Sequence, residues 1–221
     1  MFSTSWLLQT AALAALVIVA CLPHGHSPQH APAPISHSLV NSARGVGVQV
    51  VNIGAKDLIH AAEEHKEYLV LGIVWQLVKL QLMSGVSIAE HPEIFRLLEP
   101  GEELADLLKL PPEETLLRWI NFHLARSGES KRVTNFGEAL KDGSVYLTLL
   151  HSIDAAKCPV SAELKDAAAA PLDRAYAVVE NARALDVPVM VQPADIVSGN
   201  RKLNLAFVAQ IFNTRHGLEV S

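Results

Sequence analysis

Apolar residues recur at helical spacing from Thr115 onward, and helix boundary signals lie on both sides of this stretch. Pro111 and Pro112 suit a first helical turn, where backbone N–H groups have no partner within the helix. Gly128 suits the position just past a helix end. The apolar face comprises Leu116, Leu117, Trp119, Ile120 and Leu124. Arg118, Asn121, Phe122 and Ala125 lie on the opposite face, with Arg126 on the flank. The pattern predicts an amphipathic helix that buries its tryptophan.

Further helices are expected along the rest of the chain. Asp142 is placed to cap a helix that runs to Ile153, because carboxylates accept hydrogen bonds from the first backbone N–H groups. Pro171 opens another helix, with Leu172, Tyr176, Val179 and Leu185 at helical spacing, and residues 203–212 form a last core helix. No segment in this region favours a strand convincingly. We therefore predict an all-α, compact domain over about residues 111–215.

Residues 68–83 are apolar almost all round a predicted helix, and only a narrow stripe is polar. Gly72, Gln76 and Lys79 form that stripe. A helix of this kind is normally buried against other elements. The sequence therefore predicts either intramolecular cover for this helix or self-association of the chain through it.

Charge changes sign along the chain between these two helical regions. Residues 90–114 carry eight acidic side chains against Arg96 and Lys109, whereas residues 118–141 carry five basic side chains against two acidic ones. The acidic stretch contains two short amphipathic pieces, at 94–98 and 104–108. We interpret it as an interdomain linker, and the basic run as a solvated face or a binding surface.

Composition and motifs argue against several function classes. A net charge of −5 gives no support for nucleic-acid binding. The two cysteines, Cys21 and Cys158, form neither a zinc motif nor a disulfide framework. No phosphate-binding loop, nucleophile elbow or H-E-x-x-H sequence is present. His123 and His151 lie on or beside apolar helix faces, so we expect packed or capping groups. No catalytic, cofactor or metal residue is predicted.

Several motifs occur in an order that resembles a calponin-homology domain. They are L-L-R-W-x-N-x-H-L at 116–124, T-N-F at 134–136, L-K-D-G-x-x-Y-x-x-L-L at 140–150 and N-L-A-F-V-A-Q-I-F at 204–212. The resemblance extends over about residues 39–218 and is closest to the fimbrin/plastin family. Within that family it points to the second domain of the first actin-binding unit.

The resemblance implies a domain organisation. Residues 111–216 would form the calponin-homology domain, 86–110 an acidic linker, and 39–85 the C-terminal remnant of a preceding domain of the same kind. Val-rich residues 39–53 have strand propensity, but the resemblance implies a helix followed by an irregular crossing. Residues 1–38 lie outside the resemblance.

Two interpretations of the N-terminal segment remain open. Leu7 to Leu22 is almost wholly apolar and could be the apolar region of a secretory signal, although no Lys or Arg precedes it. Alternatively, the segment has no targeting role, which the resemblance to a cytoplasmic actin-cytoskeleton family favours. The following His24, His26, His30 and His37 could hold a divalent metal loosely, but a flexible Pro-rich linker is the simpler interpretation.

The resemblance also implies a function. In fimbrin-like proteins, actin is contacted by the last helix of the first domain and the first helix of the second. On this chain those helices carry the candidate actin-binding residues Tyr68, Lys79, Arg118, Phe122 and Arg126. Most of the first domain lacks a counterpart here, so we expect weakened filament binding. The alternative is a secreted or membrane-anchored helical interaction protein that does not bind actin.

Overall fold

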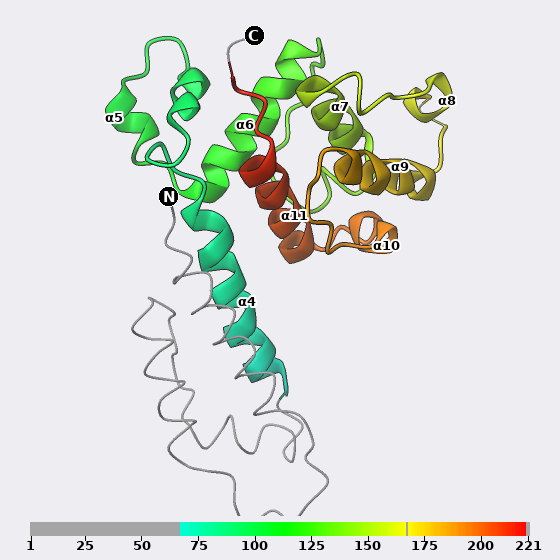
Figure 1. The fold of residues 1–221 in the computed structure, drawn as a ribbon, viewed down its shortest axis with the longest axis horizontal. Helices are drawn as coiled ribbons and strands as arrows, with labels where there is room; N and C mark the ends of the chain where they lie inside the picture. The colour runs from blue at the N-terminus through cyan, green and yellow to red at the C-terminus, as the bar shows by residue number, and fades with distance from the viewer. Residues whose placement is uncertain (1–66, 167, 220–221) are drawn as a thin grey trace, which may run out of the picture. The chain divides into compact units, whose positions relative to one another are not determined.

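The computed structural model describes residues 67–166 and 168–219, and every regular element within them is a helix (Figure 1). The chain divides into two compact units whose boundary lies between Gln81 and Leu82. The elements are α4 (Glu67–Ser84), η1 (Pro92–Leu97), α5 (Leu104–Leu107), α6 (Pro112–Arg126), α7 (Ser144–Ile153), α8 (Ala162–Lys165), α9 (Pro171–Ala184), α10 (Pro193–Val197) and α11 (Arg201–Thr214). The all-α prediction is confirmed.

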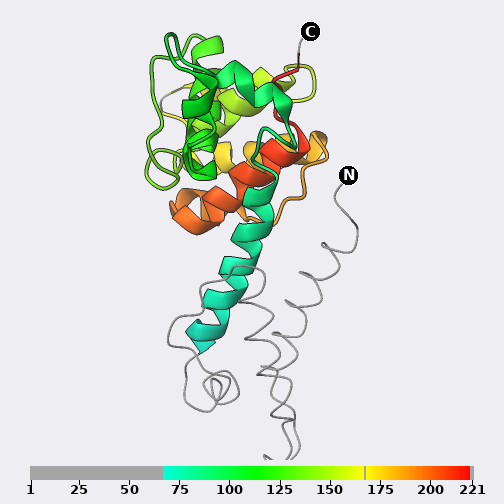
Figure 2. The ribbon, with the colours of Figure 1, turned by 90° about the vertical axis from the view of Figure 1, so that its left-hand side faces the viewer.

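Helix α11 is the centre of the second unit. All nine side chains from Asn204 to Phe212 are buried, whereas a helix on the protein surface buries only one face. Helices α6 and α10 both pack against it, as Figures 1 and 2 show from two directions. The predicted last core helix is therefore confirmed, and its cover on several sides explains its nearly unbroken apolar sequence.

Helix α6 begins and ends where the sequence predicts. Its first residue is Pro112, and the backbone N–H of Glu129 donates to the Leu124 carbonyl past a left-handed Gly128 (φ +77°). This arrangement satisfies carbonyls that a helix end otherwise leaves unpaired. Trp119 is fully buried and meets the Phe212 ring of α11 edge-on, with 5.2 Å between ring centroids.

His123, one turn after Trp119, is a packed histidine as expected. Its Nε2–H donates to the His216 carbonyl at 2.9 Å, so Nδ1 accepts from the Ser152 hydroxyl, also at 2.9 Å. Burial disfavours the charged ring and lowers the pKa of His123 to about 4. Both nitrogens are occupied by structural partners, which suits a packing role.

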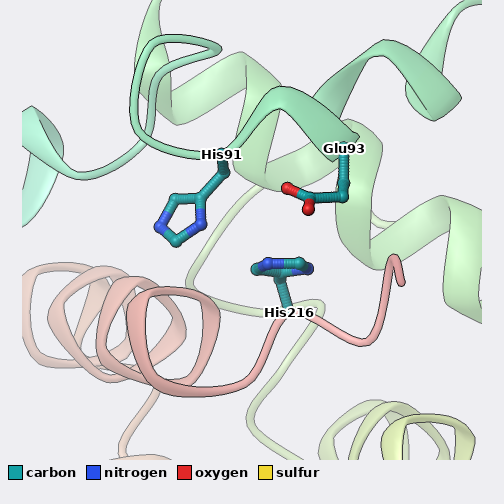
Figure 3. A group of neighbouring side chains, drawn as sticks. All are labelled: His91, Glu93 and His216. Carbon is teal, nitrogen blue, oxygen red and sulfur yellow. The ribbon is translucent and has the colours of Figure 1, made fainter. Parts of the chain in front are cut away.

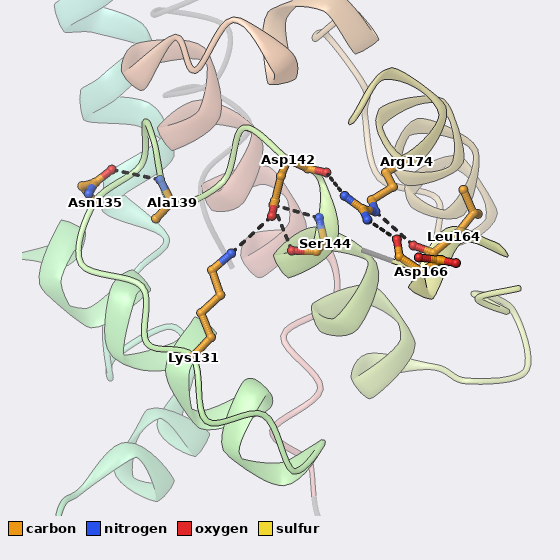
Figure 4. Close-up of polar contacts among 8 residues, drawn as sticks. All are labelled: Lys131, Asn135, Ala139, Asp142, Ser144, Leu164, Asp166 and Arg174. Carbon is orange, nitrogen blue, oxygen red and sulfur yellow. Dashed lines mark hydrogen bonds and ion pairs between the residues drawn. The ribbon is translucent and has the colours of Figure 1, made fainter. Parts of the chain in front are cut away.

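The start of α7 corrects the predicted cap by one residue (Figure 4). Gly143, in the left-handed conformation (φ +76°), occupies the cap position, and Asp142 precedes it. The Asp142 carboxylate nevertheless accepts from the Ser144 backbone N–H and hydroxyl, at 3.1 and 2.9 Å. Buried Arg174 of α9 donates to the Asp142 carbonyl at 3.3 Å and thereby joins the two helices.

Helix α9 buries a different face from the one its periodicity suggests. Leu172 and Tyr176 were expected on the apolar face with Val179 and Leu185, but both are exposed. The buried positions are Arg174, Ala175, Val178, Val179, Asn181 and Ala182. Small alanines allow α7 and α10 to approach this side closely, so tertiary packing rather than side-chain size determines the buried face.

The acidic connector is folded as part of the second unit. Its two predicted amphipathic pieces are confirmed as η1 and α5. Each buries apolar side chains, namely Ile94 and Leu97 from η1 and Leu107 from α5. Burial of these groups holds the connector in place, because removing a large aliphatic side chain from water contributes about 1.5–3 kcal/mol.

Helix α4, which spans the predicted residues 68–83, is buried along only part of its surface. Ile73 and Leu77 are buried, whereas Tyr68 and Leu71 are 64% and 67% exposed. Of the helices among residues 67–166 and 168–219, none combines the length and apolar character needed to cross a membrane. The predictions for residues 7–22, 39–53 and the four N-terminal histidines lie outside the described residues.

Replacing Gly143 by alanine tests the junction between α7 and α9. A Cβ at this position would lie 2.8 Å from Arg174 Cβ, in a conformation that already costs a non-glycine residue about 1–2 kcal/mol. Gly128→Ala is the matched control, because Gly128 has nearly the same φ but nothing within 4 Å of its added Cβ. We expect Gly143→Ala to lower the free energy of unfolding by about 1–3 kcal/mol more than the control in urea titrations. Equal losses would contradict the packing described.

A pH titration of stability tests the burial of His123. The unfolded chain, with a histidine pKa of about 6.5, binds a proton at pH values where the folded ring does not. Stability is therefore greatest above pH 6.5, where the His123 ring is neutral in both states. As the pH falls toward 4, proton binding by the unfolded chain lowers the free energy of unfolding, by roughly 2 kcal/mol at pH 5. We expect the cost of His123→Gln, measured by urea unfolding, to be largest at pH 7 and to shrink at pH 5. A cost that is independent of pH would show that the folded ring titrates normally.

Candidate interaction surface

The outward side of α6 presents a cation above an aromatic ring. The Arg126 guanidinium carbon lies 6.0 Å from the centroid of the Phe122 ring, within the range of a cation–π contact. Arg126 is exposed, and its Nη1 donates to the Gly217 carbonyl at 3.4 Å. Phe122 is half-buried because its ring also meets His123 edge-on, with centroids 5.6 Å apart. The two predicted residues therefore form one surface feature.

Arg118, on the same helix, is already paired within the chain. Its Nη1 donates to Glu102 Oε2 of the connector at 2.5 Å, and the two side chains are only 20% and 17% exposed. The hydrogen bond from Arg118, with a second from the Glu99 backbone N–H, lowers the pKa of Glu102. The predicted contact residue is thus partly covered by an acidic neighbour.

The basic loop after α6 meets the same connector. Asn121 fixes this loop by accepting from the Val133 backbone N–H at 2.8 Å and donating to its carbonyl at 2.9 Å. Beside it, Arg132 lies 3.7 Å from Glu99, both of them exposed. The change of charge sign seen in the sequence therefore corresponds, at these positions, to ion pairs between the connector and the helix–loop surface.

The candidate residues are divided between the two units. Tyr68 and Lys79 belong to α4, where Tyr68 is exposed and Lys79 half-buried, while Arg118, Phe122 and Arg126 belong to α6. Within the second unit the structure brings Phe122 and Arg126 together. Arg118 lies two turns before Arg126 along the same helix.

One group of chemically active side chains was missed by sequence reasoning. His91, Glu93 and His216 offer ligand atoms that lie within 4.8 Å of one another. The histidines come from the two ends of the second unit's sequence, so no local spacing signals the group. Cys158, by contrast, is an unreactive thiol, because burial raises its pKa to about 11 and its S–H donates to the Asn181 carbonyl at 3.5 Å.

Comparison with known proteins agrees with this fold. Residues 110–217 match the calponin homology (CH) domain family. Fimbrin of Saccharomyces cerevisiae is 44% identical over 181 residues, which cover 82% of this chain and 27% of that protein. Fimbrin of Dictyostelium discoideum is 46% identical over 183 residues, which cover 81% of this chain and 29% of that protein. Human plastin-1 is 43% identical over 195 residues, which cover 83% of this chain and 30% of that protein.

A solved structure extends the similarity to the fold. The actin-crosslinking core of Schizosaccharomyces pombe fimbrin superposes with a TM-score of 0.69 and is 32% identical in sequence. The match covers 97% of this chain and 42% of that one. This chain spans less than a third of the length of the curated relatives described above. The sequence motifs, the helical fold and these similarities together place the chain in the fimbrin/plastin family of calponin homology proteins.

Proposed function

We propose that this chain binds actin filaments as a fimbrin-type module, more weakly than a complete actin-binding unit. The observation that carries the proposal is the structural similarity to the actin-crosslinking core of S. pombe fimbrin, together with identities of 43–46% to the relatives above. The family resemblance assigns filament contacts to two helices, which correspond here to α4 and α6.

The Arg126–Phe122 pair is the proposed centre of the α6 contact. An exposed guanidinium can pair with acidic groups of a filament, and the ring beneath it adds apolar contact area. Arg118 contributes less in this proposal, because Glu102 already neutralises its charge. On α4, Tyr68 offers an exposed aromatic side chain and Lys79 a cation.

Bundling by this chain would require a second filament site. We infer that self-association through α4 supplies it, because Leu71 and Tyr68 occupy one exposed side of that helix at i, i+3 spacing. Exposed large apolar groups that adjoin one another favour association with another apolar surface.

The remaining assignments follow from the family. We propose a non-catalytic role in the cytoplasm at the actin cytoskeleton, without nucleic-acid binding. The division into a domain remnant at 39–85, a linker at 86–110 and a CH domain at 111–216 is part of the same proposal. The CH match at 110–217 supports its last boundary. Residues 86–110 keep the place of a linker in the chain order of this proposal, although they are folded as part of the second unit.

Reversing the charge of Arg126 tests the α6 contact. We expect Arg126→Glu to weaken co-sedimentation with filaments by about 3- to 10-fold, equivalent to about 0.7–1.4 kcal/mol, and to reduce its salt dependence. The Arg118→Glu/Arg126→Glu double variant should weaken binding further. Arg201→Glu is the matched control, since Arg201 is exposed at the start of α11, where negative charge is tolerated. Equal binding by the Arg126 and Arg201 variants would remove this helix surface from the mechanism.

A charged residue on α4 tests self-association. We expect Leu71→Lys to shift the full chain toward monomer in sedimentation velocity, because a lysine would have to lose its hydration at the interface. Leu108→Lys makes the same change at a similarly exposed position (57%) of the connector and should leave the distribution unchanged. A wild-type chain that is monomeric over the whole concentration range would refute the inference.

A further inference from the structure

Three side chains with metal-ligating atoms converge where the connector meets the C-terminal segment (Figure 3). His91 is the residue just before η1, Glu93 lies in the first turn of η1, and His216 follows the end of α11. Each offers one ligand atom, and these atoms all lie within 4.8 Å of one another. His216 is buried and the other two are half-buried.

The surroundings of the group favour a cation. The carboxylates of Glu93, Glu90 and Glu219 place negative charge near the His91 ring. Glu219 Oε1 also lies 3.8 Å from His216 Nε2. This negative charge would attract a divalent cation to the group.

The connector and the C-terminal segment after α11 are fixed to each other and to the core. Arg96 of η1 donates to the Leu218 and Glu219 carbonyls at 2.7 and 3.0 Å. The His216 carbonyl accepts from the Trp119 indole N–H at 2.8 Å and from His123 at 2.9 Å. Side chains on segments held in this way lose little freedom when they bind a common ion.

We propose that His91, Glu93 and His216 form a site for a divalent transition-metal ion, with Zn²⁺ as the best match. Two imidazoles and one carboxylate are a donor set that zinc accepts, with a fourth position left for water. Metal–ligand bonds of about 2.0–2.2 Å place tetrahedral ligands about 3.4 Å apart, so ligand atoms as much as 4.8 Å apart must approach one another by up to about 1.4 Å. The site goes beyond filament binding, because it uses none of the proposed contact residues.

The hydrogen bonds of His216 indicate which of its two ring nitrogens would bind the metal. The Leu218 backbone N–H donates to His216 Nδ1 at 3.1 Å, so in the neutral ring the proton is on Nε2. A metal at Nδ1 displaces this N–H but leaves Nε2–H facing the Glu219 carboxylate, an arrangement that orients many metal-bound histidines. A metal at Nε2 would instead place a proton on Nδ1, opposite the Leu218 N–H. Hydrogen bonding therefore favours Nδ1.

Occupation of the site would link the connector to the end of the CH domain. The ion would reinforce the Arg96 contacts and hold η1 against the segment that His123 and Trp119 bind. Zinc should therefore stabilise the folded chain by binding it better than the unfolded chain.

Zinc titration of the full chain tests the proposal. Because His24, His26, His30 and His37 could bind metal themselves, all four are changed to glutamine in the background protein. We expect one Zn²⁺ per chain by calorimetry, a rise in melting temperature with ZnCl₂, and visible Co²⁺ absorption typical of four-coordinate geometry. His91→Gln and Glu93→Gln should each weaken zinc binding by roughly 10- to 100-fold or more.

The matched control is His151→Gln, which removes a half-buried histidine whose Nδ1 donates to the Cys158 carbonyl. It should leave the zinc stoichiometry and affinity unchanged. His91→Gln must retain the helical circular dichroism of the background protein, so that its loss of zinc binding is not a loss of fold. No stoichiometric zinc binding by the background protein, or equal affinities of the His91 and His151 variants, would overturn the proposal. Filament co-sedimentation is a separate readout, so failure of either proposal leaves the other standing.

Discussion

The buried junction between α6 and the C-terminal segment depends on one carbonyl group. The His216 carbonyl accepts from both Trp119 and His123, side chains that lie four residues apart and hence on one face of α6. Leaving such a group buried without donors would cost about 1–3 kcal/mol. The Phe212 ring lies against Trp119, and the His216 ring lies against Phe212. Arg96 connects η1 to the Leu218 carbonyl, two residues after His216. Helices α11 and α6 and the connector therefore meet at this point.

The sequence was sufficient to predict the helices because their signals are local. Proline at the first position of α6 and the left-handed Gly128 beyond its end act within one turn of the residues they influence. The burial of Trp119 and Ile120 also follows from local periodicity, since no other face of α6 could be covered as well. The cap of α7 was predicted one residue early, because the carboxylate that accepts the hydrogen bonds does not itself occupy the cap position.

The features that the sequence did not predict depend on partners far along the chain. Tyr176 is as apolar as many core residues, and only the packing of α7 and α10 against the other side of α9 leaves it exposed. The pairing of Arg118 with Glu102 requires the connector to fold back on α6. The proximity of His91 and His216 requires both ends of the unit to meet. Periodicity contains no information about these approaches, whereas the family resemblance predicts the fold that allows them.

For the proposed filament contact, the two arginines of α6 are not equivalent. Among the described residues, no carboxylate forms an ion pair with Arg126, whose guanidinium lies over Phe122. Arg118 must exchange Glu102 for any acidic group of a partner. Ion pairs near the surface contribute little net stability, because water and salt screen them, so this exchange is close to balanced and adds little affinity. The net electrostatic attraction of α6 for an acidic surface therefore depends mainly on Arg126, while Arg118 mainly holds the connector.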